Sequence, residues 1–221
     1  MKQNQITLTD QEIINEESSY SHNDFRSHVG GGWENVYPPV RARMNKLLTS
    51  PSETVFKGKG VVRCSKIGWC FAQFCRLLGS PLFWKQGNDT ALVVKVVPTP
   101  NGLRCWHRSF EFADGTTQIV KTTKVVDSKL GFLDAVGEQG EKMLATKMDV
   151  WTKGKSLHFK GTRYFLRLGL FNLPIPNILT PGTLRAEHKD LGNGNFQYIL
   201  SFKHPIWGET FYQDGIFREE S

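Results

Sequence analysis

Residues 105–112 read Cys-Trp-His-Arg-Ser-Phe-Glu-Phe, and this stretch holds the residue types whose spacing could do chemistry. Successive side chains of a strand point to opposite faces, so Trp106, Arg108, Phe110 and Phe112 share one face. A guanidinium among three aromatic side chains must meet an anion or lose much free energy on desolvation. The pattern therefore predicts a cavity in which Arg108 contacts either the acidic group of a ligand or an internal Asp or Glu.

Two further residues extend this candidate site. Arg163 lies between Phe159 and Phe165 at alternate positions, so it repeats the arrangement around Arg108 and is a second candidate contact for an anion. Tyr164 is the next residue and could contribute a hydroxyl to the same pocket. The predicted ligand-binding residues are Trp106, Arg108, Phe110, Phe112, Arg163 and Tyr164.

The familiar signatures of catalysis and metal binding are missing from the chain. The six histidines are scattered without an HxH or HExxH pattern, and the four cysteines have no CxxC spacing. No GxSxG, P-loop or GxGxxG motif occurs. We therefore predict no catalytic residue, no metal ligand and no cofactor, and we favour a protein that is not an enzyme.

The N-terminal segment differs in composition from the rest of the chain. Residues 1–30 hold two basic and five acidic residues, although the whole chain of 221 residues carries a net charge of +7. This polar segment ends in three consecutive glycines at residues 30–32, a composition typical of a disordered tail. The predicted organisation is an acidic tail over residues 1–32 and a single β-rich domain over residues 33–221.

The charge and hydropathy patterns also bear on partners and location. A basic body can attract anionic metabolites, lipid surfaces or nucleic acid. However, no block of basic residues with interleaved aromatics appears, so we expect no specific nucleic-acid partner. No apolar run reaches the roughly 18 residues of a membrane helix, and no secretory signal is recognisable, so we expect a cytoplasmic protein without a membrane span.

Hydrophobic periodicity indicates two early helices followed by many strands. The 3.6-residue period predicts helices at 40–48 and 67–78, with a strand at about 54–64 between them. From residue 90 the period changes to two, and Asn-Gly and Asp-Gly pairs mark tight hairpins. The expected later strands are 90–98, 102–112, 116–126, 131–137, 142–152, 156–165, 183–190, 195–204 and 209–218.

Short connections favour sequential antiparallel pairing. The predicted fold is therefore mainly β (α+β), a long antiparallel meander curled into a barrel or half-barrel of about ten strands, with two short helices near the N-terminus. The apolar, proline-rich segment 170–181 remains open to three interpretations: a lid over a pocket mouth, a surface for a partner, or packed filler between strands.

The order of these segments resembles a bacterial family known as domain of unknown function 4166 (DUF4166), over residues 39–217. The residues that carry the resemblance share an order and a spacing rather than one diagnostic motif. They are Phe56–Gly60, Leu78–Pro81, Trp106–Phe110, Gly131–Leu133, Leu173–Pro176, Leu179–Pro181, Pro205–Gly208, Tyr212 and Gly215.

The resemblance implies no activity, because the family has none established. It does imply a link to metabolism, since relatives look similar to domains appended to saccharopine-dehydrogenase-like oxidoreductases. This chain has no dinucleotide motif, so such a link requires a separate oxidoreductase partner. Our prediction is a binding module that holds an amphipathic anion, a fatty acid or similar lipid, in a β-barrel cavity. The alternatives are an accessory domain for a separate oxidoreductase and an enzyme acting on a small apolar acid.

Overall fold

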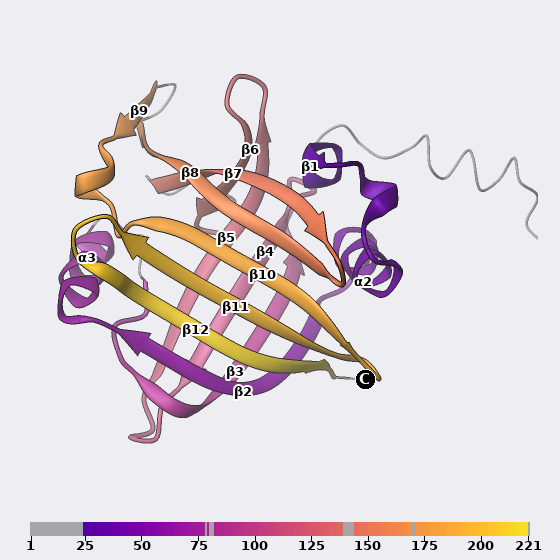
Figure 1. Ribbon diagram of the computed structural model, residues 1–221, viewed down its shortest axis with the longest axis horizontal. Coiled ribbons are helices and arrows are strands. Elements are labelled where there is room, and N and C mark those ends of the chain that lie inside the picture. Colours follow the sequence, from indigo (N-terminus) through magenta and orange to yellow (C-terminus); the bar gives the residue numbers. More distant parts are fainter. Residues whose placement is uncertain (1–23, 78, 80–81, 139–143, 169–170, 221) are drawn as a thin grey trace, which may run out of the picture.

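The computed structural model describes residues 24–77, 79, 82–138, 144–168 and 171–220, and most of them lie in strands (Figure 1). The helices are α2 (Pro38–Thr49) and α3 (Lys66–Leu77), with short 3₁₀ turns η1 (Phe25–His28), η2 (Trp33–Asn35) and η3 (Asn177–Leu179). The strands are β1 (Val29–Gly30), β2 (Thr54–Cys64), β3 (Gly87–Pro98), β4 (Arg104–Glu111), β5 (Thr117–Asp127), β6 (Gly131–Val136), β7 (Leu144–Lys153), β8 (Ser156–Leu168), β9 (Phe171–Ile175), β10 (Thr183–Gly192), β11 (Asn195–His204) and β12 (Gly208–Glu219).

The long strands close into an antiparallel barrel. The described strands follow the order β1-β7-β6-β5-β4-β3-β2-β12-β11-β10-β8-β9, and a further pairing of β7 with β8 joins the two halves. Ten strands thus form the ring, while β1 and β9 pair on its outside. The predicted meander of about ten strands is confirmed, and of the two predicted forms the closed barrel is the one found.

Closure explains how a sheet this long buries its apolar face without leaving unpaired edges. Tight turns make it feasible, and glycine backbones let β2 and β12 approach closely. An added Cβ at Gly60 would lie 2.0 Å from the carbonyl oxygen of Asp214. The glycines of β2 therefore leave the space that the backbone of β12 occupies.

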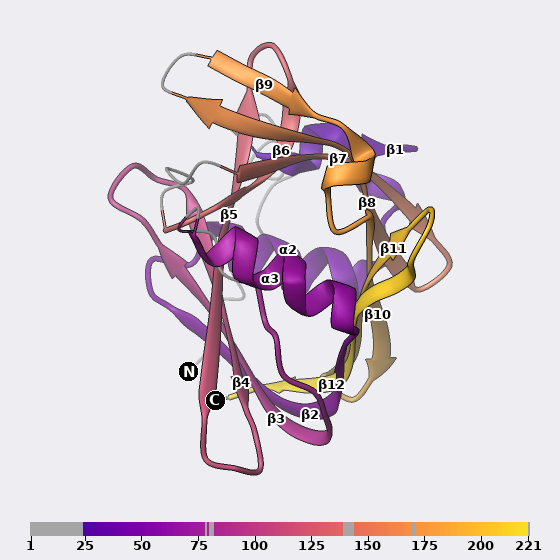
Figure 2. The same cartoon turned by 90° about the vertical axis from the view of Figure 1, so that its left-hand side faces the viewer.

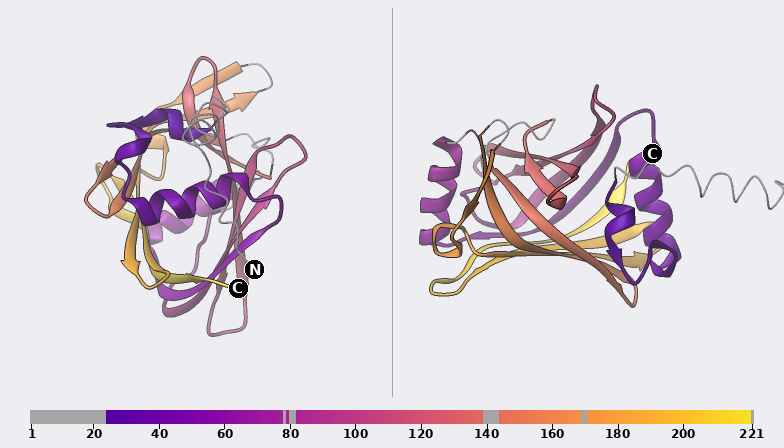
Figure 3. Two further views of the ribbon diagram at one scale, coloured as in Figure 1. Left: turned by 90° about the vertical axis from the view of Figure 1, so that its right-hand side faces the viewer. Right: turned by 90° about the horizontal axis from the view of Figure 1, so that it is seen from above.

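The two helices lie at opposite ends of the barrel (Figure 3). In α2, the buried residues Val40, Met44 and Leu47 face inward at one end. At the other end, α3 lies across the mouth of the barrel (Figure 2). No helix among the described residues is long and apolar enough to cross a membrane.

The boundary of the folded body lies earlier than the sequence indicated. Phe25 is only 2% exposed, and Val29 pairs with Val150 of β7. Residues 24–32, which the composition had grouped with the tail, therefore pack on the barrel because one aromatic side chain anchors them. The remainder of the predicted tail, residues 1–23, lies outside the described residues.

The apolar segment after β8 also has more structure than predicted. Residues 171–175 form β9, which pairs with β8, and η3 follows. Phe171 and Leu179 are largely exposed, so this segment is not packed filler between strands. It lies at the same end of the barrel as α3 (Figure 1).

Candidate functional site

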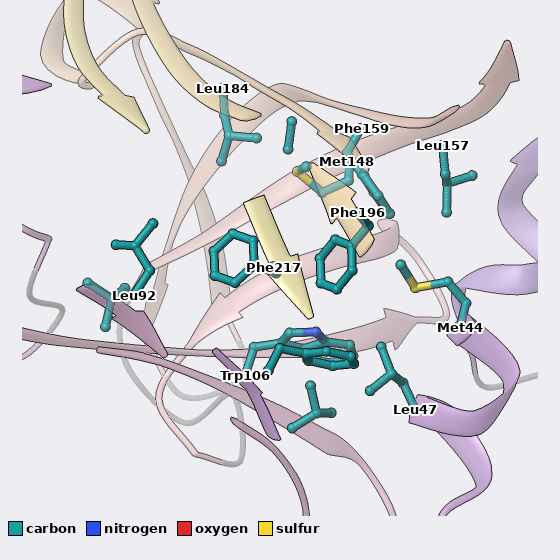
Figure 4. Packing of buried hydrophobic residues seen from close by; sticks show 14 of the residues in the cluster. Met44, Leu47, Leu92, Trp106, Met148, Leu157, Phe159, Leu184, Phe196 and Phe217 are labelled. Carbon is teal, nitrogen blue, oxygen red and sulfur yellow. The ribbon is translucent and has the colours of Figure 1, made fainter. Parts of the chain in front are cut away.

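The interior of the barrel contains a cavity of about 120 Å³. All ten barrel strands, α2 and the segment after α3 contribute to its wall. Most lining side chains are aromatic or aliphatic, and Figure 4 shows several of them directed toward one another, including Trp106, Met148, Phe159 and Phe196. The polar side chains of the wall are Arg108, Thr122, Lys124, Asp134, His188 and Tyr198.

Arg108 lies on β4 between Trp106 and Phe110, which also face the cavity. Arg108 is 8% exposed, and its Nη1 donates a hydrogen bond of 2.9 Å to Oγ1 of Thr122. Among the described residues, no Asp or Glu forms an ion pair with this guanidinium. The sequence left two partners open for Arg108, the acidic group of a ligand or an internal Asp or Glu. Among the described residues, the second is not observed.

Lys124 and Asp134 form the second polar element of the cavity. They lie directly opposite each other on β5 and β6, and Nζ of Lys124 donates to Oδ1 of Asp134 over 2.6 Å. Their side chains are 15% and 12% exposed, and the open surface borders the cavity. Burial lowers the pKa of Lys124; Asp134 opposes this effect, and the neighbouring charge of Arg108 adds to it.

Tyr198 of β11 joins the two elements from the facing wall. Burial raises the pKa of its hydroxyl, and the nearby positive charge of Arg108 partly offsets that rise. The pKa of Tyr198 is also sensitive to the charge of Asp134, so all three groups share one region of the cavity. We call Arg108, Thr122, Lys124, Asp134 and Tyr198 the polar cluster.

The remaining polar residue of the wall, His188, adds no charge to the cavity near neutral pH. Its ring stacks on Phe196 with centroids 4.3 Å apart, and Nη1 of Arg43 lies 3.0 Å from its Nε2. Burial, with the charge of Arg43, lowers the pKa of His188 to about 3. Arg43 is itself neutralised by Asp190, at 2.9 Å.

The charges of the cavity wall therefore do not balance. Arg108 and Lys124 supply two cations, whereas Asp134 supplies one carboxylate. A buried cation without an opposing charge is costly in an apolar environment, and a bound anion would relieve that cost. The arrangement can thus bind an acidic group and orient an apolar tail against the surrounding aromatic side chains.

The predicted site residues separate into two groups. Trp106, Arg108 and Phe110 line the cavity together. Phe112 is buried outside it, beside a shallow surface hollow near α3. Tyr164 packs against the core and donates a 2.6 Å hydrogen bond to the carbonyl of Gly182, but it does not line the cavity. Arg163 is exposed and is not brought to the cavity.

A bulge explains why alternation along β8 misled the prediction for Arg163. Pairing with β7 shifts between Met148, opposite Gly161, and Lys147, opposite Arg163. The extra residue, Thr162, leaves two consecutive side chains exposed and changes the face of everything that follows. Tyr164 consequently packs against the core although alternation had grouped Arg163 with the inward residues.

Four members of the polar cluster were not predicted from the sequence: Thr122, Lys124, Asp134 and Tyr198. Along strand β5 hydropathy does not follow the alternation of burial, because Ile119 is exposed while Lys124 faces the interior. One signal was available. The Asp-Gly turn after β4 sets Arg108 opposite Val120, which makes Thr122 its diagonal neighbour on the same face.

Comparison with protein families gives one match. The family model described as Domain of unknown function (DUF4166) matches residues 37–217, which is most of the chain. The chain belongs to this family. The polar cluster and all ten barrel strands from β2 to β12 fall within, or within a few residues of, the DUF4166 region, whereas η1 and β1 precede it.

Searches of curated proteins and of solved structures found no match. The chemistry of this DUF4166 domain must therefore be argued from its own residues. Within the part of the chain that the structure describes, no group of three or more His, Cys, Asp or Glu side chains could hold a metal ion. The charged cavity is the feature from which a function can be argued.

Proposed function

We propose that this protein is a binding module that holds an amphipathic anion, such as a fatty acid or similar lipid, inside its barrel. The observation that carries the proposal is the unbalanced polar cluster in an otherwise apolar cavity: two cations face one carboxylate. Hydrogen bonds to charged groups are stronger than neutral ones, and a guanidinium can bind a carboxylate through two nitrogens. Arg108 is the principal contact for the head group, with Lys124 beside it.

The apolar wall sets the nature and the length of the tail. At roughly 10–15 Å³ for each water-sized group, a cavity of about 120 Å³ has room for on the order of ten non-hydrogen atoms. Octanoate, a medium-chain carboxylate, is of this size. Each methylene buried against the wall contributes about 0.8 kcal/mol, so affinity should rise about fourfold per carbon until the cavity is full.

Native mass spectrometry of the purified full chain tests the proposal. We expect an adduct with the mass of a carboxylic acid or similar lipid, and we expect added octanoate to compete with it. Ala186 lines the cavity, so Ala186→Phe is the matched variant that should lose the adduct while remaining folded. A protein that carries no adduct and binds none of the carboxylates from hexanoate to dodecanoate would refute the proposal.

A second candidate function, an enzyme acting on a small apolar acid, is favoured by the position of Lys124, which lines the apolar cavity. Burial lowers the pKa of Lys124, and a buried lysine with a lowered pKa can act as a general base. Such a base could move a proton from C2 to C4 of a β,γ-unsaturated acid and so shift its double bond. Incubation with 3-octenoate would reveal the conjugated product by its ultraviolet absorbance. A wild-type rate equal to the rate of the Lys124→Met variant would exclude this candidate.

The separate oxidoreductase partner stays a prediction. The surface that would serve it is the apolar end of the barrel near α3, where Phe171 and Leu173 are exposed. For that end we argue a different occupant below.

A further inference from the structure

Helix α3 is packed with its large apolar residues outward. Its buried positions are the small residues Gly68, Ala72 and Cys75. Trp69, Phe74 and Leu77 are 50%, 56% and 85% exposed. An amphipathic helix of a globular domain normally turns its large apolar side chains to the core, so this orientation requires an explanation.

Close packing of the helix on the barrel fixes this orientation. An added Cβ at Gly68 would lie 2.2 Å from the carbonyl oxygen of Thr210 on β12, so this face of α3 admits no side chain there. Phe71 is half-buried, and its ring lies 5.9 Å from the ring of Trp207. The helix therefore lies flush across the mouth of the barrel, as Figure 2 shows, and its outer face cannot rotate inward.

Three neighbouring segments add exposed apolar side chains at the same end. They are β9, η3 and the turn between β11 and β12, which lie at the same end of the barrel as α3 in Figure 1, although β9 is set apart from the helix in Figure 2. His204 joins two of them, because its ring stacks on Trp207 and its Nε2 lies 3.4 Å from the carbonyl oxygen of Ile178. We call the whole set the apolar rim: Trp69, Phe74, Leu77, Phe171, Leu173, Ile178, Leu179, Ile206 and Trp207.

The segments that carry the apolar rim contain cations and no acids. No Asp or Glu occurs between Cys64 and Asp89, between Val150 and Glu187, or between Asp190 and Glu209. These three stretches contain ten Lys and Arg residues, but not all of them lie near the rim: Lys155, for example, lies over the ring of Tyr37 beside α2, at the other end of the barrel. Two acids border the rim, Asp114 in a hollow with Trp69 and Glu209 opposite Lys203, and they form ion pairs with Lys85 and Arg63. The cations exposed near the rim include Lys66 and Arg76 on α3 and Lys203 at the end of β11.

We propose that the apolar rim docks on an anionic lipid bilayer, with α3 lying in the plane of the interface. Aromatic and aliphatic side chains flanked by cations are the composition of interfacial helices, and anionic head groups complement the excess positive charge. This inference rests on surface residues outside the cavity, so it stands or falls separately from the binding of an anion inside the barrel.

Sedimentation of the full chain with lipid vesicles tests the inference. Vesicles of phosphatidylcholine and phosphatidylglycerol in equal amounts should bind the protein, whereas pure phosphatidylcholine vesicles should bind it much more weakly. Raising the salt from 0.1 M to 0.5 M should reduce the binding, because the Debye length shortens. The triple variant Trp69→Ser, Phe74→Ser, Leu77→Ser should bind at least tenfold more weakly.

Two sets of variants keep the result interpretable. The double variant Leu191→Ser, Ile216→Ser replaces exposed apolar residues near the opposite end of the barrel and should bind as the wild type does. The pair Lys66→Gln, Arg76→Gln leaves the apolar side chains in place and should weaken binding about fivefold per charge, since each charge near an anionic surface contributes about 1 kcal/mol. If the triple variant does not fold, this charge pair decides the question.

Three outcomes would overturn the inference. The first is absence of binding to anionic vesicles by the wild type. The second is binding that neither set of α3 variants changes. The third is a wild-type dimer without vesicle binding that the triple variant converts to a monomer, because the apolar rim would then be an interface between two copies of the chain. Measuring octanoate binding on the same samples separates all three outcomes from a failure of the cavity proposal.

Discussion

Replacing Arg108 by leucine separates a ligand-binding guanidinium from a structural one. The guanidinium donates a hydrogen bond to the hydroxyl of Thr122, lies near Tyr198, and forms no ion pair with a described carboxylate. Leucine suits the apolar wall formed by Trp106 and Phe110. Removing the charge also relieves its repulsion of Lys124, so the lowered pKa of that lysine should rise.

The magnitudes follow from these contacts. A hydrogen bond to a charged group contributes about 1.5–3 kcal/mol, so Arg108→Leu should weaken octanoate binding by roughly 10- to 150-fold. The free energy of unfolding of the ligand-free protein should stay within about 1 kcal/mol or rise, because replacing buried charge by an apolar group is often neutral or stabilising. A guanidinium that closed a buried ion pair would instead cost about 3–5 kcal/mol on removal.

Isothermal titration calorimetry with octanoate measures the affinity, and urea unfolding without ligand measures the stability. Octanol is the matched ligand, because it has the same chain without the charge, and its affinity should change little in Arg108→Leu. A variant with wild-type octanoate affinity and a loss of several kcal/mol in stability would refute the reasoning and leave Arg108 a structural role.

Further predictions concern the neighbours of Arg108. Octanoate binding should weaken as pH rises through the folded-state pKa of Lys124, which lies below 10.5, and Lys124→Met should remove that pH dependence in calorimetric titrations. Asp134→Asn should lower the free energy of unfolding in urea by about 3 kcal/mol, because it leaves Lys124 buried without its carboxylate, and yet should tighten octanoate binding. Ala186→Phe should fill the cavity, weakening octanoate at least tenfold while the far-ultraviolet circular dichroism stays unchanged. Between pH 6.5 and about 3, His188 is protonated in the unfolded chain but neutral in the folded protein. The free energy of unfolding should therefore decrease by up to about 1.4 kcal/mol for each unit by which the pH falls across this range. His188→Gln should show a weaker pH dependence of stability in urea unfolding.

Local sequence signals predicted most of the fold. Hairpin glycines and two-residue alternation indicated the barrel strands, and the 3.6-residue period indicated α2 and α3. The anchoring of Phe25 and the pairing of β9 were missed, because both depend on contacts with distant strands that no local pattern encodes.

The candidate site was predictable only where one strand determined it. Trp106, Arg108 and Phe110 share a face of a regular strand, so alternation alone brought them together. The other charged groups come from β5 and β6, where burial does not follow hydropathy, and Arg163 was misassigned because a bulge in β8 changes the face. The part of the site that could not be predicted depends on the register between neighbouring strands, which the composition of the chain does not indicate.

Nuclear magnetic resonance of octanoate labelled with ¹³C at the carboxyl carbon tests the central claim most directly. We expect a bound carboxyl signal that is separate from that of free octanoate. The bound carboxyl should stay ionised to a lower pH than octanoate does in water, because Arg108 and Lys124 stabilise its charge. In Arg108→Leu, that signal should weaken and titrate closer to the free acid. A bound carboxyl that titrates as it does in water, or that is unchanged in Arg108→Leu, would contradict the claim that the polar cluster holds an anionic head group.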